Sequence, residues 1–201
     1  MRLYVEGGGD SNIQRTACRR GFSEFLRKAG LEGHMPRIVA SGGRNQAYQD
    51  FYTAIKSGVS AAMLLVDSEE PIVVTSPWRH LLSRSDDRWQ APTGSTDDDC
   101  HLMVQCMESW FLADREALEK FFGQGFNSNA LPAKGSEIEV QPKESVYKLL
   151  AAATIHCKTK SVYSKGKHSF DLLAEIDPAK VTDNSQWADR FVKALKNRMG
   201  C

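Results

Sequence analysis

The sequence lacks any run of about 18 apolar residues, so it predicts no membrane-spanning helix. Its first residues, MRLYVEGGGD, carry only a short apolar run before an early glutamate, which argues against a signal peptide. A large charge of either sign is also missing, because the formal net charge is +1 at pH 7. We therefore expect a cytoplasmic protein with no membrane partner, whose contacts with nucleic acid depend on local basic patches.

Cysteine pairs at regular spacings are missing as well. The five cysteines are irregularly placed and none forms a C-x-x-C motif, which predicts free thiols in a reducing compartment. A zinc site is a less favoured alternative, because His101 begins a stretch that is typical of a strand. Such a site would draw on Cys100, His101, Cys106 and His156.

The order of apolar segments predicts the fold class. Short, nearly continuous apolar runs at residues 2–5, 37–40, 61–66 and 101–105 are typical of buried strands. Helical spacing of apolar residues between the first three runs predicts helices over 13–29 and 44–56. Strands that alternate with helices favour an α/β, Rossmann-like parallel sheet that is covered by helices on both faces.

The remainder of the chain is expected to decorate this sheet. Prolines and polar residues predict a long connection over 70–100 that contains a short helix near 78–82. Further helices are predicted over 108–122, 143–154, 169–176 and 185–198. We expect one domain, with a core at 1–122 and a helical C-terminal extension at 123–201 packed on it.

Acidic residues follow three of the predicted strands. Glu6 ends the first, Asp67 ends the third with Glu69 two residues later, and Glu108 follows the fourth. Because functional groups gather at the carboxyl ends of parallel strands, these acids are candidate ligands for Mg²⁺ or Mn²⁺ that contacts a phosphate. Asp10 is close enough in sequence to assist, although it is equally suited to cap a helix, and Glu108 could belong to the first turn of its helix.

Several basic residues are candidates for phosphate contacts. Arg44 follows two glycines at the start of a predicted helix, a setting that suits anions, although a solvated turn explains it equally well. Arg15 and Arg19 lie one turn apart and could follow a nucleic-acid backbone, but a solvated helix face is the commoner explanation. Lys165 could stabilise charge on a cleaved phosphate, with a flexible basic loop as the alternative.

Two segments carry a resemblance to the Toprim superfamily. They are LYVEGGGD at residues 3–10 and MLLVDSE at residues 63–69, which match a strand ending in glutamate and a later strand ending in a pair of acids. The resemblance implies a compact parallel sheet, acid–base or metal-binding work for Glu6, and Mg²⁺ binding by Asp67 and Glu69. The chain departs from the motif at Glu69, where an aspartate is usual, and this weakens topoisomerase or primase chemistry more than cleavage.

The whole chain also resembles stand-alone bacterial Toprim-like proteins that are often encoded beside an ATPase of the ABC or overcoming-lysogenization-defect type. The segments that carry this likeness are SGGR at 41–44, HLMVQCMESWFLAD at 101–114 and YSKGKH at 163–168. The resemblance implies an ATPase partner, a role in anti-phage defence, and a catalytic lysine, for which we take Lys165.

The sequence thus favours a metal-dependent nuclease that cleaves phosphodiesters in DNA or RNA. In this hypothesis Glu6 and Lys165 are catalytic, while Glu6, Asp67 and Glu69 hold the metal with help from Glu108 and Asp10. Two alternatives stay open: a regulatory subunit without catalysis that docks on an ATPase, and a phosphoesterase that acts on a small nucleotide.

Overall fold

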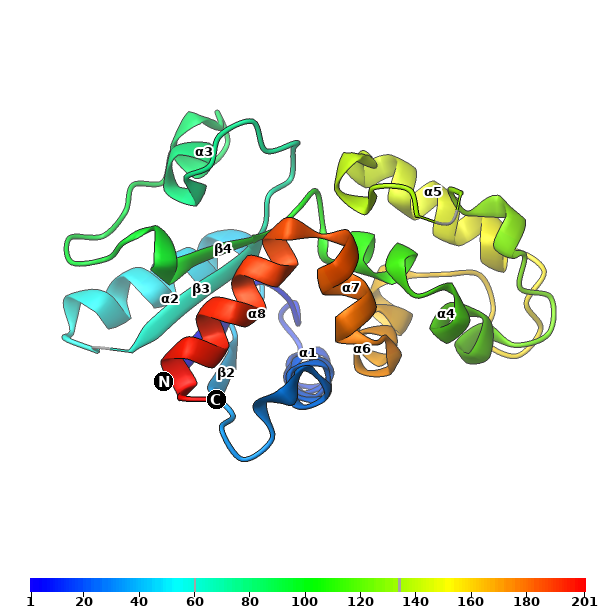
Figure 1. Ribbon diagram of the computed structural model, residues 1–201, viewed down its shortest axis with the longest axis horizontal. Helices are drawn as coiled ribbons and strands as arrows, with labels where there is room; N and C mark the ends of the chain where they lie inside the picture. Colours follow the sequence, from blue (N-terminus) through cyan, green and yellow to red (C-terminus); the bar gives the residue numbers. More distant parts are fainter. Residues whose placement is uncertain (60, 134) are drawn as a thin grey trace.

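A single parallel sheet organises the chain, as seen in a computed structural model that describes residues 1–59, 61–133 and 135–201 (Figure 1). Its strands are β1 (Arg2–Val5), β2 (Arg37–Ala40), β3 (Ala62–Asp67) and β4 (Cys100–Met103). All the pairings are parallel and the strand order is β2-β1-β3-β4. The predicted α/β fold class is therefore confirmed.

The strand order places a switch in direction at the centre of the sheet. From β1 the chain crosses to β2 on one side, and then returns past β1 to β3 and β4 on the other. The connections therefore diverge between β1 and β3. In open parallel sheets, ligands bind in the crevice outside the carboxyl ends of two such strands.

Eight α-helices surround the sheet in the described parts of the chain. Their bounds are α1 (Asn12–Leu26), α2 (Arg44–Lys56), α3 (Pro77–Ser83), α4 (Arg115–Phe122), α5 (Lys143–Thr154), α6 (Lys165–Glu175), α7 (Pro178–Asn184) and α8 (Gln186–Met199). None of the helices that the structure describes is long and apolar enough to cross a membrane.

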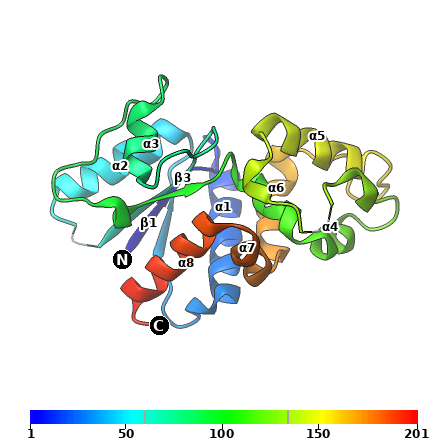
Figure 2. The same cartoon turned by 45° about the horizontal axis from the view of Figure 1, so that its top comes forward.

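Alternating strand residues divide the core between the two faces of the sheet. Leu3 and Val5 join a core with residues of α1 and α8, whereas Tyr4 joins a second core with residues of α2 and α3. This is the two-residue period expected of a strand that is buried on both sides. Figure 2 shows the sheet between these two layers of helices.

The predicted helical C-terminal third is confirmed, and it lies against the strands and helices of the first half. Helix α6 packs along α1, and α8 packs against β4. Helices α4 and α5 lie to one side of the sheet (Figure 1). Because α5 and α6 begin near the carboxyl ends of the strands, residues at their amino termini can contribute to a site there.

One predicted helix is wrong. The segment Glu108–Phe122 is not continuous but consists of a 3-10 helix, Met107–Ala113, followed by α4. The buried Asp114 separates them, since its carboxylate accepts hydrogen bonds from the backbone N–H groups of Ala117 (3.2 Å) and Asp177 (2.9 Å). Apolar spacing could not reveal a break that depends on the distant α7, which was itself not predicted.

Candidate metal centre

Three carboxylates meet where the strand order switches direction. Glu6 follows β1, Asp67 ends β3, and Glu69 lies two residues further on. One oxygen from each residue lies within 4.8 Å of the others. The structure thus brings together the three acids that the sequence placed at adjacent strand ends. Oxygen atoms of this kind and spacing suit a hard divalent cation.

Glu6 is fixed through one carboxylate oxygen. Its Oε2 accepts hydrogen bonds from the backbone N–H of Asp67 at 3.1 Å and from Nη1 of Arg44 at 3.4 Å. Its Oε1 has no hydrogen-bond partner within the part of the chain that the structure describes. Burial raises the pKa of Glu6 against the opposing charge of Arg44. Glu6 therefore presents one oxygen that is free to bind a cation or a proton.

Asp67 is the most deeply buried of the three acids, with 2% exposure. Its Oδ1 accepts a hydrogen bond from the backbone N–H of Met107 at 2.8 Å, and its Oδ2 lies 3.6 Å from Nζ of Lys143. Burial raises its pKa well above the usual range, and the nearby charges of Glu6 and Glu108 add to that rise. A bound divalent cation would relieve this unfavourable environment.

A strained turn positions Glu69. Glu69 and Gln105 both have positive φ angles, 65° and 62°, which are uncommon for residues other than glycine. The backbone N–H of Glu69 donates to the Gln105 carbonyl at 3.1 Å. The buried Ser68 hydroxyl accepts from the Gln105 N–H at 2.7 Å and donates to the Glu70 carbonyl at 2.6 Å. Such strain persists where the surrounding structure enforces it, as it does here.

Glu108 lies beside the three acids but is bound differently. It is fully buried, and its carboxylate accepts hydrogen bonds from the hydroxyls of Tyr147 (3.2 Å), Tyr163 (3.2 Å) and Ser169 (3.0 Å). Burial and the Glu108 charge raise the pKa of both tyrosines, which keeps them protonated as donors. Glu108 was predicted to be a metal ligand, but both of its carboxylate oxygens already accept hydrogen bonds from hydroxyls.

A cavity of about 380 Å³ lies beside these acids, and Lys165 is among the residues that line it. Glu6, Asp67 and Glu108 line it, together with the glycine loop at residues 7–9. The Lys165 side chain is 54% exposed, and its Nζ lies 3.1 Å from the Tyr147 hydroxyl and 3.9 Å from Glu108. Burial opposes its charge, but the carboxylates of Glu108 and Asp67 outweigh that effect and raise the pKa of Lys165. The cavity is therefore lined by three acids and by the ammonium of Lys165.

The triple glycine is required by close packing. Gly7 and Gly8 have φ angles of 138° and 91°, and a Cβ on Gly8 would lie 2.8 Å from Cα of Arg15. Gly7 also pairs with Gly42 through two backbone hydrogen bonds of 2.8 and 2.9 Å. The loop that leads out of Glu6 is thereby fixed against α1 and against the start of α2.

Arg44 supports the site from within. Its guanidinium binds both carboxylate oxygens of Asp87, at 2.8 and 2.6 Å, and it also binds the Asp67 carbonyl. It lies 4.8 Å from the ring centre of Trp89. These contacts fix the arginine next to Glu6 rather than leaving it free for a phosphate, which was its predicted role.

The remaining predicted residues lie outside the cluster. Asp10 is exposed and does not belong to the group of three carboxylates. Arg15 donates to the Gly9 carbonyl at 3.2 Å and so holds the glycine loop, while Arg19 is exposed on α1 and bonds to Thr16. Arg15 and Arg19 therefore stay candidates for contacts with a substrate that extends beyond the cavity.

Lys143 is the main residue that sequence reasoning missed. Its Nζ lies 2.5 and 2.6 Å from the two carboxylate oxygens of Glu69. Lys143 is distant in sequence from the acids of the cluster. It reaches them because the fold of the C-terminal third brings α5 to the end of the sheet. A local signal existed in the four-residue spacing of Lys143 and Tyr147, which places both on one face of a helix.

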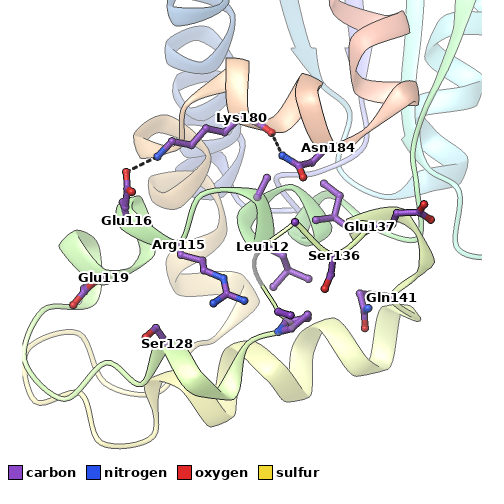
Figure 3. Close-up of a pocket in the computed structure, with 15 residues that line it drawn as sticks. Leu112, Arg115, Glu116, Glu119, Ser128, Ser136, Glu137, Gln141, Lys180 and Asn184 are labelled. Carbon is purple, nitrogen blue, oxygen red and sulfur yellow. Dashed lines mark hydrogen bonds and ion pairs between the residues drawn. The ribbon is translucent and has the colours of Figure 1, made fainter.

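A second cavity, of about 460 Å³, lies between α4, α7 and the loop near residue 136, and none of the three acids of the cluster lines it. Arg115 points into it, and one wall is formed by the Lys180–Glu116 ion pair of 2.7 Å (Figure 3). Acidic, basic and neutral side chains are mixed around it, so its lining shows no preference for one class of ligand.

The model of a family described as a domain of unknown function (DUF4276) matches residues 5–196. No curated protein and no solved structure matches the chain. The match covers strands β2 to β4, the last residue of β1, the three carboxylates of the cluster, and the C-terminal helices except the end of α8.

Proposed function

The chain belongs to the family described as a domain of unknown function (DUF4276), and we propose that it is a metal-dependent nuclease that hydrolyses phosphodiesters in DNA or RNA. The observation that carries this proposal is the meeting of Glu6, Asp67 and Glu69 at the sheet's switch point, with oxygens within 4.8 Å of one another. The Toprim resemblance, which we retain as a proposal, is consistent with the same three positions.

The donor set fits a divalent cation. Carboxylate oxygens are the ligands that Mg²⁺ and Mn²⁺ prefer, and the ammonium of Lys143 already lies against two of the three acids. When bound, such a cation supplies polarisation of a phosphate oxygen and acidification of a water. Glu6, Asp67 and Glu69 would hold it. Burial, with a smaller contribution from neighbouring acids, raises the pKa of Glu6 and of Asp67, and a cation would stabilise their charged forms.

The proposed task of Lys165 is to bind the substrate phosphate. Its exposed ammonium lines the cavity, and Tyr147 links it to the buried Glu108 through bonds of 3.1 and 3.2 Å. Because Glu108 is fixed by three hydroxyls, it provides a rigid counter-charge that orients Lys165. A lysine in this position would neutralise charge that develops on a phosphate during cleavage.

Glu6 is the proposed proton carrier. Its Oε2 is held by Arg44 and by the backbone of Asp67, whereas Oε1 is available at the cavity. In the metal-free site burial raises its pKa, so Oε1 can hold a proton there until a cation takes its place. Arg44 and Asp87 keep the residue in position during this exchange.

A regulatory role beside an ATPase is the second candidate. Val73 lies in the connection between β3 and α3 and is 88% exposed, and it lines a surface pocket with Ile72, Val74 and Trp187, an apolar group that suits a protein contact. We propose that an ATPase of the ABC or overcoming-lysogenization-defect type is the partner and that the chain acts in anti-phage defence, as the resemblance implies. The assay below is therefore run with and without a co-purified partner.

The test is cleavage of supercoiled plasmid and of total tRNA in Mg²⁺ or Mn²⁺, with bis(p-nitrophenyl) phosphate as a small phosphodiester. The wild type is compared with Asp67→Ala and with Asp98→Ala, a matched change at a residue whose side chain is 78% exposed. We expect metal-dependent cleavage of one polymer that is lost in Asp67→Ala and retained in Asp98→Ala. Cleavage of the small ester alone would favour a nucleotide phosphoesterase, and no cleavage with or without the partner would contradict the proposal.

A further inference from the structure

Lys143 places a positive charge directly on the carboxylate cluster. It is the first residue of α5, and its side chain is 24% exposed. Its Nζ contacts both oxygens of Glu69, at 2.5 and 2.6 Å, and lies 3.6 Å from Oδ2 of Asp67. Two of the three acids in the cluster therefore share one ammonium.

On the basis of the proposed cation centre, we infer that Lys143 competes with the divalent cation for Glu69 and Asp67 and must leave Glu69 for the metal to bind. Mg²⁺ requires its oxygen ligands at about 2.0–2.1 Å in near-octahedral geometry. An ammonium that donates to both oxygens of Glu69 occupies the positions from which that carboxylate would bind a metal. Lys143 is therefore a positioning residue that sets the metal affinity of the site.

Arg44 also contacts the cluster, but a metal ion cannot displace its guanidinium in this way. Arg44 is held on its far side by two hydrogen bonds to Asp87, whose side chain is 2% exposed, and by the ring of Trp89. Its guanidinium contacts the cluster at the Glu6 carboxylate, at 3.4 Å, and at the backbone carbonyl of Asp67. Lys143 instead ends a flexible four-carbon chain, so its ammonium can move without disturbing the backbone.

The position of Lys143 also connects metal binding to the phosphate-binding side of the cavity. One turn along α5, Tyr147 bonds to both Glu108 and Lys165. An ammonium released from Glu69 stays on the same helix face as Tyr147 and so remains next to the cavity. The displaced charge is thus retained beside an incoming phosphate.

The experiment is an isothermal titration of Mn²⁺ into full-length protein, with no nucleic acid present. Lys143→Met removes the competing charge with little change in side-chain length, Lys143→Arg strengthens it through a bidentate pair, and Lys148→Met is the control at an exposed residue of the same helix. We expect Lys143→Met to bind Mn²⁺ about fivefold more tightly than the wild type, Lys143→Arg to bind more weakly, and Lys148→Met to be unchanged.

A second readout guards against misfolding. In chelator, Lys143→Met should melt at a lower temperature than the wild type, and saturating Mn²⁺ should raise its melting temperature by more than it raises that of the wild type. Equal or weaker Mn²⁺ binding by a folded Lys143→Met would overturn the inference and leave the nuclease proposal standing. Tighter binding without any cleavage of nucleic acid would support the inference and count against the nuclease. An absence of Mn²⁺ binding in the wild type would overturn both.

Discussion

The two ends of the sheet both bury charged groups, but they balance those charges differently. At the amino end, Arg190 donates to Nδ1 of His101 at 2.9 Å and to the Cys100 carbonyl at 3.0 Å. Beside it, Arg198 pairs with Asp99 at 2.7 Å. Asp99 also accepts from the Thr96 N–H in a capping box, so each charged group at this end serves the local fold.

At the carboxyl end, acids exceed the cations that can neutralise them. Four carboxylates surround the cavity or its rim: Glu6, Asp67, Glu69 and Glu108. Of the cations nearby, Lys143 is shared by Glu69 and Asp67, Arg44 is shared with Asp87, and Lys165 is half exposed. Burial is the main cause of the raised pKa values of Glu6 and Asp67, and the charges of neighbouring acids add to the rise. Buried charges that lower stability in this manner are typical of functional sites.

The largest expected effect is a loss of cleavage activity when an acid is changed at the carboxyl end of the sheet but not at the amino end. Glu6→Gln keeps an acceptor for Arg44 but removes the charge and the proton-carrying capacity of Glu6, so cleavage should fall by about 10³-fold. The matched change Asp99→Asn at the amino end should leave the cleavage rate per folded molecule unchanged. Rates at saturating Mn²⁺ measure both variants, and a Glu6→Gln enzyme with wild-type activity would remove Glu6 from the proposed chemistry.

A smaller loss of activity is expected when the counter-charge of Lys165 is removed. Glu108→Gln retains hydrogen bonds to the surrounding hydroxyls but no longer attracts the ammonium, and outer-shell changes of this kind typically cost about 10–100-fold. Glu119→Gln, at an exposed residue of α4, is the control. The expected signature is a larger change in KM for the polymer than in Mn²⁺ affinity, whereas the reverse would make Glu108 a metal ligand.

At the amino end, the expected effect is on stability against pH. Burial and the charge of Arg190 lower the pKa of His101 from 6.5 to about 3, and its Nε2–H donates to the Asp98 carbonyl at 3.1 Å. The unfolded state binds the proton more readily than the folded state. The contribution of His101 to the free energy of unfolding is therefore fully present above pH 6.5 and is lost as the pH falls toward 3.

His101 should therefore account for a loss of about 1.5 kcal/mol in unfolding free energy between about pH 6.5 and about pH 5. Urea titrations at these two pH values measure it, with His101→Gln as the comparison. The variant should be less stable at neutral pH but should show a shallower decline on acidification. An unchanged slope would mean that His101 is already charged in the folded protein.

The smallest expected effect is a change in the free energy of unfolding that has opposite signs at the two ends of the sheet. In chelator near pH 8, Asp67→Asn should stabilise the protein by about 1 kcal/mol, because it removes a buried charge whose pKa is raised by burial and by neighbouring acids. Asp99→Asn should destabilise it by a similar amount, through loss of its pair with Arg198. Thermal melts compare the two, and destabilisation by both would show that Asp67 is structural like Asp99.

The sequence was informative wherever local pattern and strand adjacency determine the outcome. Continuous apolar runs located β1, β2 and β3 to within a residue, and β4 to within two. Glu6 and Asp67 meet because they end neighbouring parallel strands, a consequence that follows from the fold class alone. Glu69 follows from Asp67 by proximity in the chain, although its left-handed backbone could not be anticipated.

The groups that balance these acids could not be located from the sequence. Lys143 and Glu69 are 74 positions apart, and Arg44 and Asp87 are 43 positions apart, so their pairing depends on how loops and helices pack. The hydroxyls around Glu108 come from α5, from α6 and from the residues before it. For the same reason the break at Asp114 was missed, since its partners Asp177 and Lys180 lie in and next to α7.

We propose that the carboxyl end of the sheet is a divalent-cation centre and that the amino end is not. Equilibrium binding of Mn²⁺, followed by the electron paramagnetic resonance signal of the free ion, tests it most directly on the wild type, Asp67→Asn and Asp98→Asn. The expected result is binding by the wild type and by Asp98→Asn, with binding lost in Asp67→Asn. Undiminished binding by Asp67→Asn, or none by the wild type, would contradict the claim.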